Sequence, residues 1–176
     1  MQWYETVFEL IDLRSFSNLW YWIALAVLWS SASHYVIGVP FDLVMRAKRS
    51  RDMQAQTDLE DMVRINVNRL VYITRVSGLW MVGIVCSVLT MLTLLGFVYR
   101  IELCQAVLLL FAPMTLVGIL SLRFAHVLQA SDLKGEALRK RMTRHRFWTQ
   151  LIGIVSIFIT AMWGMWQNLN LGPFGT

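Results

Sequence analysis

Two histidines are the residues of this chain best placed to support chemistry inside a membrane. His34 follows the small residues Ser30–Ser33 within an apolar run, and His126 lies at the end of another such run. An ionisable residue within a membrane is a functional hypothesis by default, and two histidines on facing helices can hold a haem or another tetrapyrrole. The alternative is that His34 hydrogen-bonds within a helix bundle while His126 is solvated. No zinc-type Cys/His spacing or acidic cage accompanies the pair, so we expect no cofactor, and a tetrapyrrole is the lesser alternative.

The two cysteines, Cys86 and Cys104, do not form a ligand set. If the two apolar runs around them form a hairpin, Cys86 lies deep in one arm while Cys104 lies just past the turn. Side chains at such different depths cannot form a disulfide, and they cannot ligate one iron–sulfur cluster. We interpret both as packing residues.

Enzyme motifs are absent from the sequence. It contains no nucleophile elbow, no His-Glu-x-x-His, no Walker loop and no paired acidic residues within an apolar run. We therefore expect a protein that is not an enzyme, with neither catalytic residues nor a metal site.

The basic residues lie beside the apolar runs and not in a polar domain. Next to a membrane span such clusters usually set topology and contact anionic lipid headgroups, so we expect lipid and not nucleic acid as their partner. The residues assigned to headgroup contacts are Arg46, Lys48, Arg49, Arg75, Arg123, Arg139, Lys140, Arg141, Arg144 and Arg146.

Apolar runs position all of these residues. The chain is 57% hydrophobic and 15% charged, whereas a soluble domain has about a quarter charged residues. A membrane span needs about 20 apolar residues. The sequence predicts an all-α polytopic membrane protein, one domain over residues 1–176, with spans at about 19–39, 70–98, 103–122 and 147–169. The short polar join at 99–102 makes the central pair antiparallel, so we expect an antiparallel four-helix bundle.

Two basic connectors, 40–69 and 123–146, separate the spans, and we expect both to continue as long helical extensions. Pro40 predicts a break after the first span. A capping box, Thr57-Asp58-Leu59-Glu60, predicts that the second helix begins near Asp58 and runs to about Tyr99, which is about twice the membrane thickness. The excess should stand in water or bend along the surface. Residues 1–16 predict an external amphipathic helix, and we expect no cleavable signal peptide because its charges are acidic.

Orientation follows from the positive-inside rule. The two connectors carry most of the arginines and lysines, while the other side has Arg14 in the first segment and Arg100 in the hairpin turn. Connectors rich in Lys and Arg face the cytoplasm. We therefore expect a bacterial inner-membrane location, cytoplasmic connectors and both termini in the periplasm.

Small residues recur at helical spacing on three of the spans. In lipid, helices associate through close contact of such residues, because burying Leu against Leu gains nothing over burying it against acyl chains. Each stripe could serve internal packing or a partner surface. The residues are Ala26, Ser30 and Ser33; Gly83, Ser87 and Thr90; and Gly153, Ser156, Thr160 and Gly164.

The residues from Val7 to Ala47 read VFELIDLRSFSNLWYWIALAVLWSSASHYVIGVPFDLVMRA. This segment resembles a family of small four-span membrane proteins from alphaproteobacteria such as the Rhodobacter and Roseobacter groups. The resemblance extends over most of the chain. Members often carry the label "component of SufBCD complex", which refers to the iron–sulfur assembly scaffold. The resemblance implies a bacterial inner-membrane protein and identifies no catalytic motif.

Three functions remain open from the sequence. The leading hypothesis is a non-catalytic accessory or assembly subunit that binds a membrane-protein partner or further copies of itself through its small-residue stripes. The second is a homo-oligomeric ion channel or transporter pore lined by Ser and Thr. The third is a tetrapyrrole-binding redox membrane protein that uses His34.

Overall fold

The structure is a computed structural model that describes residues 16, 18–49, 53–131 and 133–170. The predicted amphipathic helix, apart from Phe16, and the last six residues lie outside the described part of the chain. The described residues form five α-helices, a π-helical turn and one two-stranded β-hairpin, so the prediction of an all-α protein is confirmed. The elements are α2 (Leu19–His34), β1 (Tyr35–Val36), β2 (Val39–Pro40), α3 (Phe41–Arg49), α4 (Met53–Thr93), η2 (Leu94–Val98), α5 (Glu102–Ser131) and α6 (Gly135–Asn170).

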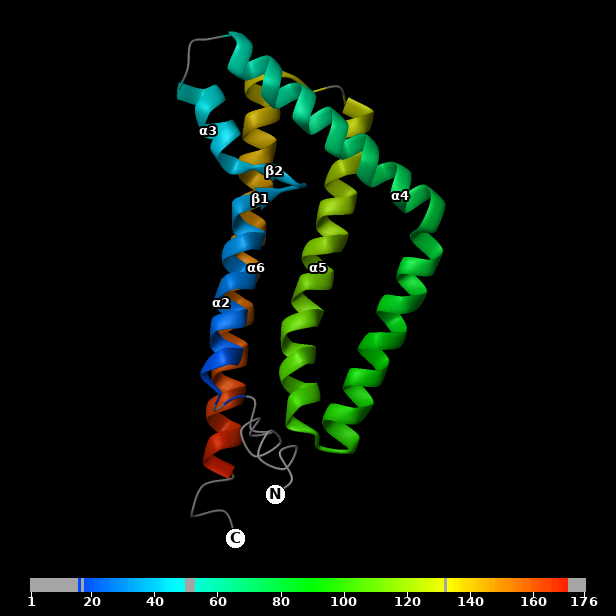
Figure 1. Cartoon of the computed structure of the whole chain (residues 1–176), viewed down its shortest axis with the longest axis vertical. Helices are drawn as coiled ribbons and strands as arrows, with labels where there is room; N and C mark the ends of the chain where they lie inside the picture. Colours follow the sequence, from blue (N-terminus) through cyan, green and yellow to red (C-terminus); the bar gives the residue numbers. More distant parts are fainter. Residues whose placement is uncertain (1–15, 17, 50–52, 132, 171–176) are drawn as a thin grey trace, which may run out of the picture.

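Three helices in the described part of the chain are long and apolar enough to cross a membrane. They are Met53–Val98, Glu102–Ser131 and Gly135–Leu169. They contain the predicted spans at 70–98, 103–122 and 147–169. In Figure 1, α2, α5, α6 and the second part of α4 run along the long axis of the molecule, with α2 beside α6. The three long helices suggest a multi-pass membrane protein.

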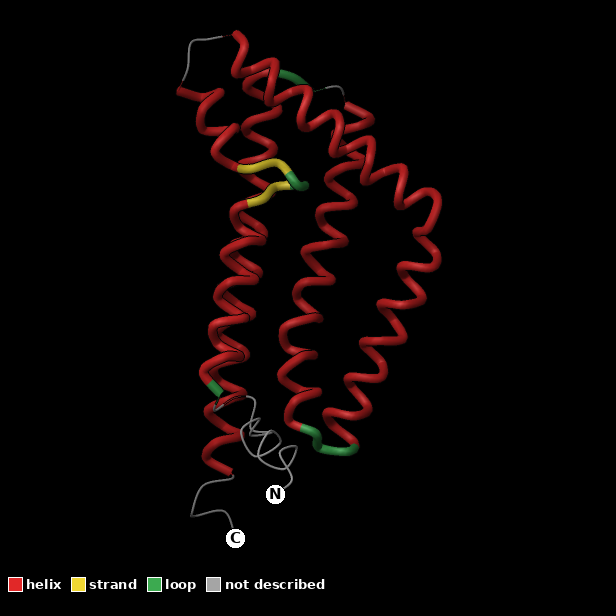
Figure 2. The backbone as a smooth tube through the Cα atoms, viewed as in Figure 1, coloured by secondary structure: helices red, strands yellow, loops and turns green. Residues whose placement is uncertain are grey.

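The prediction that the first span is helical over 19–39 is wrong in its extent. Helix α2 has 16 residues and ends at His34, so it is about 24 Å long against a hydrocarbon core of about 30 Å. Its beginning agrees with the sequence, since Asn18 accepts a hydrogen bond from the backbone N–H of Trp20. The span is shorter because Tyr35–Pro40 forms a β-hairpin, which is yellow in Figure 2.

The hairpin explains why α2 stops. Tyr35 pairs with Pro40 and Val36 with Val39 in antiparallel register. The two turn residues, Ile37 and Gly38, have φ angles of 52° and 73°. Positive φ at both central residues is the geometry of a tight turn that matches the twist of the strands. Pro40 therefore ends a strand that leads into α3, and the predicted break takes the form of a reversal of the chain.

The second helix begins earlier than its capping box predicted. Helix α4 starts at Met53, and the Thr57 hydroxyl donates to the carbonyl of Met53 from inside the helix. Glu60 instead accepts a hydrogen bond from the backbone N–H of Gly135 at 2.9 Å. Gly135 is the first residue of α6, so Glu60 satisfies a free donor at the start of another helix.

Helix α4 and η2 form a continuous helical segment of 46 residues, about 70 Å long. Figure 1 shows that the first part of α4 crosses over the end of the molecule and that the helix then bends to run down beside α5. The bend removes the excess length from the direction of the spans, as the sequence predicted. Its second part diverges from α5 towards the bend and approaches it at the hairpin turn.

A compact apolar core, which we call the apical core, occupies the upper end of the molecule in Figure 1. The hairpin and α3 meet the start of α4, the end of α5 and the start of α6 there. Side chains such as Val39, Leu59 and Met142 are completely buried. Its buried members are Val36, Val39, Phe41, Val44, Ala47, Leu59, Val63, Val67, Ala125, Leu128, Leu138 and Met142.

Helices α2 and α6 pack closely through a glycine. A Cβ added to Gly153 would lie 2.8 Å from the indole of Trp29, nearer than van der Waals contact permits. Trp29 is 4% exposed. The absence of a side chain at Gly153 therefore lets the indole lie flat against the backbone of α6.

We predict that the same Gly→Ala substitution changes the free energy of unfolding differently at two positions. Gly153→Ala forces Trp29 to move and should lower the free energy of unfolding by about 1–3 kcal/mol. Gly118→Ala is the matched control, because no described atom lies within 4 Å of its added Cβ, and it should be neutral or stabilise by up to about 1 kcal/mol. Denaturant titration in detergent measures both. Equal stabilities for the two variants would contradict the proposed contact.

Candidate functional site

The small-residue stripe of α6 serves internal packing. Gly153 faces Trp29, and a Cβ on Gly164 would lie 3.2 Å from Phe16. Ser156 and Thr160, between them, are 6% and 0% exposed. This stripe therefore lies inside the protein and is not an exposed partner surface.

The small residues of α2 do not share this arrangement. Ala26 and Ser30 are exposed, and α2 instead packs through Leu25 and Trp29. Ser33 is half-buried, and its carbonyl accepts a hydrogen bond from Nε of Arg146 at 3.0 Å. Large side chains therefore form the packing face of α2.

The stripe of α4 is exposed at all three of its positions, whereas the α2 stripe is exposed at two of three. Gly83, Ser87 and Thr90 are all exposed, and no described atom lies within 4 Å of a Cβ added to Gly83. The Thr90 hydroxyl donates to the carbonyl of Cys86, so its hydrogen bond is satisfied within the helix. We call this set the α4 stripe. An open hollow includes Gly83 and Ser87 of this stripe and is lined by Leu79, Trp80, Gly83, Ile84, Ser87 and Val88.

Helix α4 is the least covered of the three long apolar helices. In the most apolar 18-residue stretch of α4, 6% of the residues are buried, compared with 17% in the corresponding stretch of α5 and 28% in that of α6. Leu79 is 91% exposed and Trp80 77% exposed. Near the hairpin turn, in contrast, Gly96 is buried against Gln105 of α5. The second part of α4 is thus held at its two ends and largely uncovered between them.

A polar cluster, which sequence reasoning missed, holds the hairpin end together. The Gln105 side chain, 4% exposed, donates to the Gly96 carbonyl of η2 at 2.7 Å. Its carbonyl oxygen accepts hydrogen bonds from Nε1 of Trp163 at 3.0 Å and from Nε2 of Gln167 at 2.6 Å, both on α6. One side chain therefore connects three helices. A glutamine directly after the hairpin turn was the only sequence signal, and its partners are distant in the chain.

The structure does not bring the two predicted histidine ligands together. His34 is exposed at the end of α2, where its Nε2 lies 3.9 Å from Oδ2 of Asp42 and its ring contacts Tyr35. His126 is exposed on α5. Within residues 16, 18–49, 53–131 and 133–170, no group of three or more His, Cys, Asp or Glu residues could hold a metal ion. Cys86 is exposed and Cys104 partly exposed, both as free thiols.

A different histidine, His145, is integrated into the fold. It is 8% exposed and stacks on Phe124 of α5, with ring centroids 4.6 Å apart and an interplanar angle of 6°. Its Nε2 lies 3.2 Å from the Ser121 hydroxyl. The contacts of His145 with Phe124 and Ser121 join α6 to α5 near the apical core. The sequence showed His145 only as a member of a basic cluster.

The predicted headgroup residues divide into two groups. Some have partners within the protein: Arg139 bonds to Gln56, Lys140 pairs with Glu136 at 2.9 Å, and Arg146 lies 4.0 Å from the ring centroid of Phe41. The others are exposed, and no ion pair is found for them among the described residues. These are Arg46, Lys48, Arg49, Arg75, Arg123, Arg141 and Arg144.

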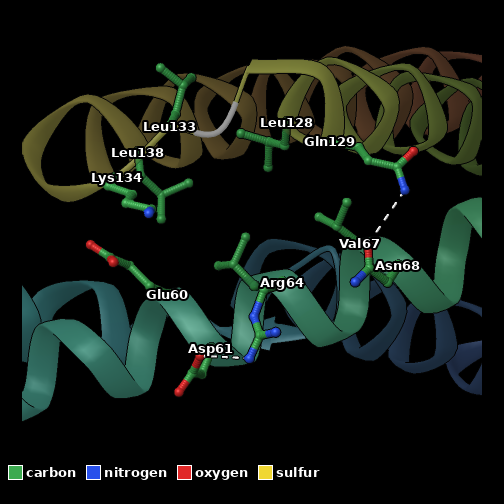
Figure 3. A pocket seen from close by; sticks show the side chains of 11 residues that line it. Glu60, Asp61, Arg64, Val67, Asn68, Leu128, Gln129, Leu133, Lys134 and Leu138 are labelled. Atoms are coloured by element: carbon green, nitrogen blue, oxygen red, sulfur yellow. Dashed lines mark hydrogen bonds and ion pairs between the residues drawn. The ribbon is translucent and has the colours of Figure 1, made fainter.

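A polar pocket of about 390 Å³ lies between α4 and the ends of α5 and α6 (Figure 3). Polar and charged side chains that line it form hydrogen bonds or ion pairs within the protein. Arg64 pairs with Asp61 at 2.9 Å, Glu60 accepts from Gly135, and Gln129 donates to Asn68 at 3.4 Å. The pocket thus resembles a crevice between packed elements more than a site that attracts a charged ligand.

The fold and its surfaces define the class as a helical protein with three candidate membrane-spanning helices. Comparison with known proteins gives no match to a protein-family model, to a curated protein or to a solved structure. Any particular function is therefore argued from this chain's own residues.

We predict that Gln105→Leu destabilises the hairpin end. It removes three hydrogen bonds and leaves the Gly96 carbonyl and the Trp163 indole N–H without their partner, which should cost about 2–4 kcal/mol. Thermal unfolding in detergent measures the change. Gln150→Leu, at an exposed position of α6, is the control and should change stability by less than about 0.5 kcal/mol. A Gln105→Leu protein as stable as the control would disprove the role of the cluster.

Proposed function

We propose that this protein is a non-catalytic accessory or assembly subunit of a larger bacterial inner-membrane complex, and that its partner binds the exposed part of α4. The observation that carries this proposal is the 6% burial of the most apolar stretch of α4. A membrane helix presents its exposed apolar side chains to lipid or to a partner, and α4 exposes more of its surface than α5 or α6 does.

The composition of the α4 stripe supports a protein partner. Gly83, Ser87 and Thr90 are small or short and lie on one face, so a second helix can approach closely and gain van der Waals contacts that lipid chains do not supply. The large side chains Leu79 and Trp80 border the same hollow and can pack around an incoming helix. Its large exposed apolar area fits contact with lipid as well as with another protein, so the small residues are what favour a protein partner.

The rest of the protein is arranged to hold this surface. The apical core fixes the first part of α4, and the Gln105 cluster fixes its end at η2. Between these anchors the helix is free to accept a partner.

For the arrangement in the membrane we propose four spans, with α2 as the first and both termini in the periplasm. Helix α2 lies alongside α6, packed through Trp29 and Gly153. Its 16 residues are short, and tight packing on a longer helix with local thinning of the bilayer accommodates such a length. The exposed basic residues of α3 and α6 lie at the apical end, which the positive-inside rule places in the cytoplasm.

Reporter fusions test this topology. A periplasmic phosphatase fused after Thr176 should be active, whereas the same reporter inserted between α3 and α4, after Ser50, should be inactive, because the basic residues retain that end in the cytoplasm. A cytoplasmic fluorescent reporter at the same two positions is the control and should show the inverse pattern. Phosphatase activity at both positions, or at neither, would refute the three spans α4 to α6 between them. A cysteine introduced at Gln2 that a membrane-impermeant thiol reagent fails to label from the periplasm would refute α2 as the first of four spans.

We predict that Gly83→Ile abolishes binding to the partner without unfolding the protein. The branched side chain fills the α4 stripe and separates the two helices, which should weaken association by about 2 kcal/mol or more. Affinity purification of the full chain from native membranes, followed by quantitative mass spectrometry against the wild type, measures the loss of one defined set of membrane proteins.

Gly118→Ile on α5 is the matched control, because its added Cβ also meets no described atom within 4 Å. It should leave the co-purified set unchanged. If both variants retain the same proteins as wild type, or if the wild type purifies alone, the proposal fails. If instead Gly83→Ile disrupts a homo-oligomer, the second copy of this chain is the partner, and ion flux in liposomes then tests whether Ser87 and Thr90 line a pore.

A further inference from the structure

An apolar groove of about 710 Å³ opens between α4, α5 and α6, on the side that faces lipid in the proposed arrangement. It is separate from the polar pocket near the apical core, and helical geometry places its α4 residues about 100° around the helix from the α4 stripe. Its walls are made mostly of aliphatic side chains. Leu89, Leu109, Leu116, Trp148, Val155 and Ile159 line it.

The dimensions of the groove match one leaflet of a bilayer. On α6 the lining residues run from Trp148 to Ile159, a rise of about 16 Å. Half of a hydrocarbon core is about 15 Å thick. An empty apolar groove of this size inside a membrane would be filled by hydrocarbon, and one lipid acyl chain has the length to fill it.

Two arginines lie beyond the apical end of the groove, one on α5 and one on α6. On α6, Arg144 lies one helical turn before Trp148, and on α5, Arg123 lies two turns beyond Leu116. At 3.6 residues per turn both arginines fall on the same faces as these lining residues. An acyl chain in the groove therefore has its headgroup at the level of both guanidinium groups.

A packed pair of rings holds the two arginines at this level. Phe124 and His145 are their immediate neighbours in sequence, and these rings stack with centroids 4.6 Å apart. The contact between His145 and Ser121, at 3.2 Å, adds a second link between the same two helices. Arg123 and Arg144 therefore belong to one end of one helix pair.

Both arginines are exposed, and within the described part of the chain neither forms an ion pair or a hydrogen bond. The nearest acidic residue along α6, Glu136, pairs with Lys140. Guanidinium groups bind phosphate through two parallel N–H donors, which a lysine cannot do. The end of the groove thus offers an unneutralised positive site at headgroup depth.

We propose that this groove is a binding site for one anionic phospholipid, with an acyl chain between α5, α6 and α4 and its phosphate held by Arg123 and Arg144. Charge complementarity at the mouth selects an anionic lipid over a zwitterionic one. The lipid would fill the space that the divergence of α4 from α5 leaves open, so it would support the α4 surface from behind.

Native mass spectrometry of the full-length protein tests the proposal. The protein, released from mixed micelles containing equal phosphatidylglycerol and phosphatidylcholine, should retain one phosphatidylglycerol. Arg123→Gln with Arg144→Gln should reduce the ratio of bound to free phosphatidylglycerol about 25-fold, since each charge-assisted hydrogen bond to the phosphate contributes at least about fivefold. Ala112→Phe, which fills the groove without changing charge, should also reduce retention.

Arg46→Gln with Arg49→Gln is the matched control, because it removes the same charge from exposed positions on α3 at the same end of the molecule. It should leave retention within about twofold of wild type. Circular dichroism and gel filtration verify that each variant is folded. The proposal is overturned if phosphatidylcholine is retained equally, if the Arg123/Arg144 variant matches the control, or if Ala112→Phe dissociates a dimer without affecting bound lipid.

Discussion

The apical core is the constraint on which the arrangement of the helices depends. Between helices in lipid the hydrophobic effect supplies no driving force, because acyl chains are as apolar as the side chains. The apical core lies where the chain is rich in charged residues, and there burial of Val39, Leu59 and Met142 removes apolar surface from water. It gathers the end of α5 and the start of α6, and it fixes α3 and the first part of α4 against them.

This arrangement explains how a helix can be left largely uncovered. Helix α4 is anchored at its start by the apical core and at its end by Gln105, which bonds to the carbonyl of Gly96. The anchors determine the direction of the helix without covering its middle. The two ends of the helix thus carry its packing, and its exposed middle contributes little to the fold.

The packing of α2 on α6 follows a different rule. Here a large ring, Trp29, lies against the backbone at Gly153, and Phe16 lies against Gly164. Close contact of a large side chain with a glycine is one way in which helices associate where lipid surrounds them. Two buried polar groups at this interface, the Ser156 hydroxyl and the Trp29 indole N–H, find no hydrogen-bond partner among the described residues, so the interface depends on shape more than on polar contacts.

Helical composition, the three long apolar helices and their order could be predicted from the sequence, because length and hydropathy are local properties of a segment. The break at Pro40 is also local, and it was predicted. The β-hairpin was not, because its turn needs positive φ at Ile37 as well as at Gly38, and Ile rarely adopts it. The capping box at Thr57 was misinterpreted because Glu60 has a partner in α6, far along the chain.

The small-residue stripes also separate what the sequence determines from what the tertiary structure determines. The sequence by itself determined that small residues recur on three helices, since spacing places them on one face. Tertiary structure alone decided that Gly153 packs inside while Gly83 is exposed, because periodicity does not state which neighbour, if any, a face meets. It also decided that Gln105 joins three helices and that Phe124 stacks on His145, since such contacts form between residues distant in the chain.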